Sequence, residues 1–414
     1  MRTNYLFVLI GVLTILLFPA CEKNSDVNLD KKLNFSNLPV EQQKQKIESS
    51  GIDFVDAMEG LLETEAFTVI ESALAVIPLD NSGSEILYVL RNDLKAGNAG
   101  VLTNLDRQMK VVYEDDDFTW GEYAYNFQTE EIELIRELNK KIIIKLPASE
   151  DAYNNQRNNA TISFEYSDSS VTIPYEEEFY PKSAQFLIKV DNKNVLEASF
   201  SGSYFDDGMP KKLKQSLTID AYTWELNLDN NKKKASSDYQ FKKAKQILIR
   251  YGAELTGRLS FEDFENAAQN DEINNLADKV AAYFQVMDVA VKGGFNDVKA
   301  LANSMNNISH NLSDEAYANK VAEVLNQQFV GYAYFVNDNK KFADLEFYAQ
   351  EYERESEWNY FDTNGNPITV YETGYDVLPR FVLNDGSKVS VEEFINTGFE
   401  DLIDRINEIA GNIE

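Results

Sequence analysis

Residues 161–166 read TISFEY, and apolar and polar side chains alternate throughout this stretch. Successive side chains of a β-strand point to opposite faces of a sheet, so the pattern predicts a strand with Ile162, Phe164 and Tyr166 on one face. The same alternation returns in 196–204 and in 222–228. The stretch therefore indicates a region of the chain that is organised by a period of two.

Turn-forming residues separate these alternating stretches. Clusters rich in Asp, Asn, Gly and Pro stand at 191–194, 206–210 and 229–231. Short polar turns between regular strands predict an antiparallel β-meander with one buried face over about residues 109–259. We expect four side chains on its covered face: Phe164, Phe200, Trp224 and Ile249.

Helical periodicity flanks the predicted meander. Residues 40–94 carry apolar side chains at a spacing of three to four and predict an amphipathic helical pair. The later part of the chain predicts helices at 263–285, 296–307, 314–328 and 391–409, with strands at 332–336, 342–352 and 377–383. Strands and helices thus come in separate runs, which predicts an α+β fold: an antiparallel β-meander packed against helical segments, with a C-terminal mixed helix/strand region.

The N-terminus has the features of an export signal. Arg2 is followed by an apolar run over residues 6–18, and small Ala20 stands immediately before Cys21, the only cysteine of the chain. A run of this length fits the roughly 7–15 residues of a signal peptide and is shorter than the ~20 residues of a membrane-spanning helix. The sequence predicts cleavage before Cys21.

The segment Phe18-Pro19-Ala20-Cys21 resembles the lipobox of bacterial lipoproteins, and the resemblance covers about the first 25 residues. It implies that the Cys21 thiol carries a lipid that anchors the exported chain in the cell envelope, with the outer membrane expected and its leaflet open. A catalytic thiol and an intermolecular disulfide are the alternative uses of this cysteine.

These features divide the chain into four parts. We expect a signal peptide over 1–20, a polar tether over 21–39, a helical hairpin with the meander over 40–260, and a helical and β-hairpin region over 261–414.

The charge of the chain disfavours nucleic acid as a partner. The chain has 39 Lys and Arg against 69 Asp and Glu, a formal net charge of −30. So acidic a protein repels phosphate backbones, which are bound by clustered cations. The exception is a basic run at Lys232, Lys233 and Lys234, continued by Lys242, Lys243 and Lys245, which we interpret as a solvated hairpin tip and an edge strand.

No catalytic or metal-binding pattern emerges from the residues. His310 is the only histidine, no G-x-S-x-G motif accompanies it, and a two-histidine zinc site is not possible. Carboxylate runs at 114–117 and 176–178 are expected to be solvated loops. Residues 362–372 fail the spacing of a calcium loop and are better explained by an Asn-Gly turn. We expect no catalytic residues, no metal and no cofactor.

Two further patterns concern glycines and aromatic residues. Gly293-Gly294 predicts a strand-to-helix turn, with Asn296 as the helix N-cap. Aromatic side chains on strands suit either a core or a recognition surface. We expect Phe164, Phe200, Trp224 and Phe347 in the core and a partly exposed set at Trp120, Tyr123 and Tyr125.

Three functions are compatible with this sequence. The first is a non-enzymatic, envelope-anchored lipoprotein with a binding or structural role, whose protein, glycan or lipid ligand is unknown. The second is an apolar-ligand or lipid carrier with a cavity under a curled antiparallel sheet, by analogy with lipoprotein-carrier folds. The third is a hydrolase that uses carboxylates alone.

Overall fold

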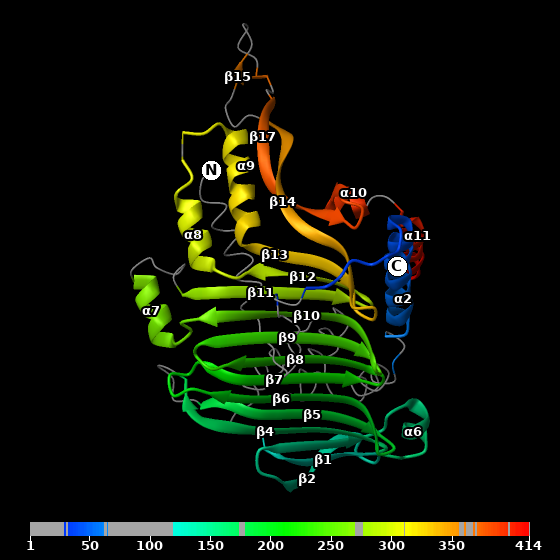
Figure 1. Ribbon diagram of the computed structural model, residues 1–414. Coiled ribbons are helices and arrows are strands. Elements are labelled where there is room, and N and C mark those ends of the chain that lie inside the picture. The colour runs from blue at the N-terminus through cyan, green and yellow to red at the C-terminus, as the bar shows by residue number, and fades with distance from the viewer. Residues whose placement is uncertain are drawn as a thin grey trace. The chain divides into compact units, whose positions relative to one another are not determined.

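A computed structural model describes residues 29, 32–61, 64, 119–173, 179–269, 276–309, 311–355, 360–361, 367–368, 371–395 and 398–413. Figure 1 shows their helices and strands, and contacts among the residues divide the chain into two units. The first unit contains Asp53–Asn231 and Ala235–Gly252; the second contains Asp26–Ile52, Lys232–Lys234 and Ala253–Glu414. In the described part of the chain, sixteen strands belong to one mostly antiparallel sheet.

The first unit is built on long antiparallel strands. Its strands are β1 (Gly121–Asn126), β2 (Glu131–Glu137), β3 (Lys141–Leu146), β4 (Ala160–Thr172), β5 (Phe179–Val190), β6 (Lys193–Tyr204), β7 (Pro210–Ile219), β8 (Tyr222–Asn230), β9 (Lys234–Lys243) and β10 (Gln246–Gly257). The order is β10-β9-β8-β7-β6-β5-β4-β3-β1-β2, and β1 runs parallel to β3. A short helix, α6 (Glu150–Asn154), begins at the N-cap Ser149.

Turn chemistry explains how consecutive strands of this unit come to be neighbours. Asp191 and Asn192 alone separate β5 from β6, and both have positive φ, 47° and 67°. A two-residue turn with two left-handed residues matches the twist of the flanking strands, and Asp and Asn tolerate it best after glycine. The expected antiparallel sheet is therefore present.

The second unit contains the remaining strands and most of the described helices. Its strands are β11 (Ala277–Val286), β12 (Val289–Phe295), β13 (Phe329–Phe335), β14 (Lys340–Glu355), β15 (Tyr360–Phe361), β16 (Pro367–Ile368), β17 (Tyr371–Leu383) and β18 (Lys388–Ser390). Six of them follow the order β18-β17-β14-β13-β12-β11, while β15 and β16 pair with each other. Its helices are α7 (Phe261–Gln269), α8 (Val298–Asn306), α9 (Asp314–Gln328), α10 (Val391–Ile395) and α11 (Glu400–Ile413).

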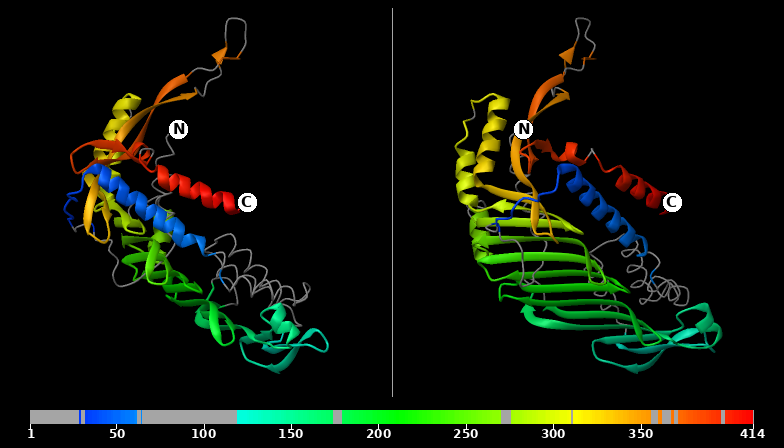
Figure 2. Two further views of the ribbon diagram at one scale, coloured as in Figure 1. Left: turned by 90° about the vertical axis from the view of Figure 1, so that its right-hand side faces the viewer. Right: turned by 45° about the vertical axis from the view of Figure 1, so that its right-hand side comes forward.

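Two hydrophobic clusters hold the second unit together. Phe335, Phe342 and Phe381 pack with Phe394 of α10 and with Val40 and Ile47 of α2 (Val40–Glu59). A separate cluster joins α8 to α9 through Leu301, Val321 and Val324. In Figure 2, α2 (blue) lies alongside α11 (red), and the Glu48 carboxylate accepts the backbone N–H groups of Asp401 and Leu402. A side chain of one helix thus caps the N-terminus of the other.

The structure corrects two predicted helices and confirms one. The helix expected at 263–285 ends at Gln269, and β11 occupies Ala277–Val286, because pairing with β12 overrides local helical preference. The closing helix expected at 391–409 is divided into α10 and α11, with Gly398 between them at a φ of 90°. Helix α9 has the predicted bounds, and Ser313 caps it by accepting the Ala316 N–H.

The turn predicted at Gly293-Gly294 is also wrong. Both glycines lie within β12, and the N-cap of α8 is Asp297 instead of Asn296. A Cβ at Gly293 would lie 2.7 Å from Cζ of Phe329, and one at Gly294 would lie 2.2 Å from the Val280 carbonyl oxygen. The glycines are therefore needed because a ring and a backbone approach the strand closely.

The basic run lies at the tip of a hairpin, as expected, but the strand that follows it is not at the edge of the sheet. Lys232 and Lys233 lie between β8 and β9, whereas β9 has β8 and β10 as neighbours. Lys242 pairs with Glu225 at 2.6 Å, and the Lys243 ammonium donates to the Ala57 carbonyl at 3.2 Å. These lysines make contacts within the fold.

Candidate ligand-binding surface

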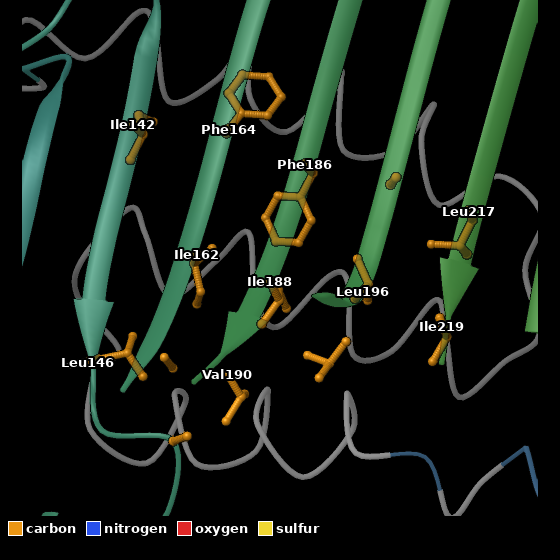
Figure 3. Packing of buried hydrophobic residues seen from close by; sticks show 14 of the residues in the cluster. Ile142, Leu146, Ile162, Phe164, Phe186, Ile188, Val190, Leu196, Leu217 and Ile219 are labelled. Atoms are coloured by element: carbon orange, nitrogen blue, oxygen red, sulfur yellow. The ribbon is translucent and has the colours of Figure 1, made fainter. Parts of the chain in front are cut away.

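One face of the first unit's sheet carries mostly apolar side chains in the middle of strands β4 to β9. Side chains directly opposite one another across β4 to β9 form a closed row: Phe164, Phe186, Ala198, Leu217, Trp224 and Phe241. Five of the six are buried, and Trp224 packs against the cluster that contains the first four. The core continues toward one end of the strands, where Ile188 and Leu196 are fully buried (Figure 3).

Two residues further along each strand, the same face is only half-buried. We name this set the aromatic row: Tyr166, Ala184, Phe200, Gln215, Leu226 and Tyr239. Every member is intermediate in exposure. Tyr251 of β10 stacks on Tyr239 with ring centroids 4.5 Å apart and is 39% exposed. Six strands spaced by about 4.8 Å make the row roughly 24 Å long.

A glycine lets aromatic rings fold over the sheet next to this row. Gly202 lies two residues after Phe200, and a Cβ there would be 2.6 Å from the Tyr204 hydroxyl and 3.0 Å from Cζ of Phe200. The Tyr204 hydroxyl donates to the Pro181 carbonyl at 3.0 Å, and its ring stacks on Tyr180 at 4.6 Å. The rings are thus held in place by contacts that a larger residue at 202 would break.

The aromatic row carries no ionisable group other than tyrosine. Burial raises the pKa of Tyr239, and the neighbouring Tyr251 raises it further; burial also raises the pKa of Tyr251. A raised pKa favours the neutral phenol, so these hydroxyls stay uncharged at physiological pH. The surface is suited to an uncharged, apolar ligand.

The opposite face of the same strands is polar. The row that alternates with the aromatic row consists of Glu165, Gln185, Ser199, Ser216, Glu225 and Gln240. Lys141 pairs with Glu165 at 2.7 Å, and Lys242 pairs with Glu225. Polar side chains on one face are typical of an antiparallel sheet whose other face is apolar.

The residues that we expected on the covered face lie there to different degrees. Phe164 is 8% exposed, whereas Phe200 and Trp224 are half-buried. In β10, Leu248 is fully buried and the expected Ile249 is only half-buried. The sequence pattern identified the apolar face, but not the part of it that is only half-buried.

The partly exposed aromatic set expected in β1 is only partly correct. Trp120 and Tyr123 are half-buried, but Tyr125 is 6% exposed and packs against Phe127 and Tyr153. Trp120 stacks on Phe164 at 6.4 Å and so belongs to the core cluster. The expectation of partial exposure is therefore correct for Trp120 and Tyr123 and wrong for Tyr125. Phe347 is half-buried against Phe329.

Several predicted positions lie outside the described residues. These are Cys21, His310, the acidic runs 114–117 and 176–178, residues 362–366 of the Asn-Gly turn, and most of the helical pair expected after residue 61. The described residues contain no group of three or more His, Cys, Asp or Glu that could hold a metal ion. Within the same ranges, no helix combines the length and apolarity needed to cross a bilayer.

Sequence reasoning placed Phe200 in the core and did not single out Tyr239 or Tyr251. Both tyrosines lie near the middle of their strands, β9 and β10, where no sequence signal separates them from buried aromatic residues. No protein-family model, no curated protein and no solved structure matches this chain.

Proposed function

We propose that this chain is a non-enzymatic, lipid-anchored binding protein of the bacterial cell envelope and that its aromatic row binds an apolar ligand. The observation that carries the proposal is the change of burial along one apolar face, from the closed row to the half-buried aromatic row. Half-buried apolar surface still contacts water, and a bound ligand that covers it would be favoured by the hydrophobic effect.

The lipid at Cys21 is the second part of the proposal. It is supported by the apolar run, the small residue before the cysteine and the polar residues after it. In this interpretation the β-meander packed against helical segments presents the ligand, and the membrane is reached through the acyl chains alone.

A carrier is the alternative function, and the same surface would serve it. The aromatic row crosses six strands, which suits an extended apolar chain better than a compact ligand. A carrier releases its ligand to a second membrane, whereas an anchored binding protein keeps it. We do not propose a hydrolase, because no side chain of the aromatic row carries a carboxyl group.

Binding of an apolar fluorescent dye tests the proposal. N-phenyl-1-naphthylamine is titrated into the chain that starts at residue 22, and its fluorescence is measured. Phe200→Asn removes an aromatic surface from the row and is expected to weaken binding about tenfold, the equivalent of roughly 1.4 kcal/mol.

Ser199→Asn is the matched control, because Ser199 is the preceding residue of β6 and points to the polar face. It is expected to leave dye binding unchanged. Equal dye affinity in Phe200→Asn, Ser199→Asn and the unaltered chain would contradict the proposal.

A further inference from the structure

The chain that follows Cys21 is fastened to the second unit before the first helix begins. Leu29 is 4% exposed and packs with Ala281 and Tyr283. A Cβ on Gly294 would lie 2.9 Å from Cδ1 of Leu29, so the leucine occupies space that a glycine leaves open. Removal of a leucine side chain from water is favourable, so burial of Leu29 fastens the segment to the unit.

Backbone hydrogen bonds extend this attachment at Phe35. The residue forms a parallel bridge with Lys341, next to bonds from the Ser36 N–H to the Lys341 carbonyl at 2.7 Å and from the Lys341 N–H to the Asn34 carbonyl at 3.0 Å. The Lys341 ammonium lies 4.0 Å from the centroid of the Phe35 ring. Two residues more than 300 positions apart thus hold each other through main chain and side chain.

Side chains of the second unit hold the next residues. The Asn384 amide donates to the carbonyls of Ser36 and Leu38 at 3.1 and 3.0 Å. Gln43, 1% exposed, donates to the Leu38 carbonyl at 2.6 Å. Lys46 forms ion pairs with Asp288 at 3.0 Å and with Asp338 at 2.5 Å. The described residues of 32–46 are therefore integrated into the unit.

These contacts limit the distance between a lipid on Cys21 and the second unit. Eight Cα-to-Cα steps join Cys21 to Leu29, and they span at most about 29 Å in any conformation. A free tether that reached to Val40 would have nineteen steps and span up to about 68 Å. Docking of Leu29 and Phe35 therefore shortens the reach by more than half.

We infer that docking of Leu29 and residues 32–38 holds the second unit close to the lipid bilayer surface, so that the protein acts as a fixed receptor at one membrane and not as a shuttle between two. The inference rests on the lipidation of Cys21 proposed above. If the protein stays at one membrane, its apolar ligand must either come from that membrane or be delivered to it.

Energy transfer to labelled lipid tests the inference. The full, lipidated chain is reconstituted into phosphatidylcholine vesicles that contain an acceptor-labelled lipid headgroup. Because Cys21 is the only native cysteine and would be acylated, Asn337→Cys supplies a single labelling site in the exposed turn between β13 and β14, near the bridge at Lys341. High transfer is expected.

Two variants test separately the length of the tether and the docking of the segment. Twenty-four Gly and Ser residues inserted after Ser25 add a root-mean-square length of roughly 27 Å and should reduce the transfer efficiency by at least half. Leu29→Asp combined with Phe35→Asp should undock the segment and reduce the transfer as well, and circular dichroism shows whether the fold is retained. Asn34→Asp, at an exposed residue of the same segment whose hydrogen bond with Lys341 uses the backbone carbonyl, is the control.

The outcomes distinguish the inference from the function on which it rests. Mass spectrometry of the N-terminal peptide reports the acyl chains, and their absence would overturn the lipid anchor together with this inference. Acylated protein with unchanged transfer after the insertion would overturn the inference alone. Reduced transfer in both the insertion and the double variant supports it.

Discussion

Truncation of Ile188 to Ala should destabilise the first unit strongly. The side chain is fully buried in β5, between Ile162 of β4 and Leu196 of β6, which are its direct cross-strand partners. Removing three buried carbons costs about 2.4 kcal/mol in transfer free energy, at about 0.8 per carbon. The cavity left behind adds about 1.5–2 kcal/mol, so the free energy of unfolding should fall by about 4 kcal/mol.

Truncation of Leu226 to Ala is the informative comparison. Leu226 belongs to the same apolar face but is half-buried in the aromatic row. With less surface to lose and a site already open, it should cost only about 1–2 kcal/mol. Lys189→Ala, next to Ile188 and on the other face, should change the free energy of unfolding by less than about 1 kcal/mol.

Urea unfolding followed by tryptophan fluorescence measures these differences, because Trp120 and Trp224 both lie in the first unit. Equal losses for Ile188→Ala and Leu226→Ala would refute the reasoning, since the aromatic row would then be as closed as the core. A loss below about 1 kcal/mol for Ile188→Ala would show that the core around Ile188 is not sealed from water.

Three further outcomes are expected. Gly202→Ala should lower the melting temperature and weaken dye binding, because its Cβ would displace the Tyr204 hydroxyl; an unchanged melt and affinity would contradict the packing described for Gly202. Burial opposes ionisation of Glu346, but hydrogen bonds from Lys388 and Arg380 outweigh it and hold the pKa below its ordinary 4.5. The stabilisation by ionised Glu346 is therefore present above pH 4.5 and lost as the pH falls through the folded pKa. The urea midpoints of the unaltered chain and of Glu346→Gln should therefore converge in acid. A difference between the two midpoints that stays constant with pH would argue against this role of Glu346. Cys21→Ser should release the protein from the membrane fraction and leave the signal peptide uncleaved, as judged by fractionation and apparent mass; continued membrane association without incorporated lipid would disprove the anchor.

Local chemistry explains the parts of the fold that could be predicted. The alternation in TISFEY became β4, because a period of two suits a strand with one apolar face. Ser313 and the acidic residues after it define the start of α9, since they satisfy free N–H groups within the same short segment. In both cases the interactions that decide the structure are close in sequence.

Predictions failed where distant partners decide the structure. Residues 277–286 have helical character next to α7, yet hydrogen bonds to β12 make them a strand. Gly293-Gly294 has the composition of a turn, but its glycines accommodate the Phe329 ring and the backbone of β11. The residues next to these glycines in the sequence do not indicate such close contacts.

By itself, the sequence determined the antiparallel character of the central strands, the turns between them, the acidic charge and the lipobox-like segment. Periodicity and turn chemistry act over a few residues, and one sequence therefore contains them in full. Only the tertiary structure decided which row of the apolar face stays half-buried and how Leu29 and Phe35 dock. Burial depends on what covers a residue, and the residues that hold Phe35 lie some 300 positions further along the chain.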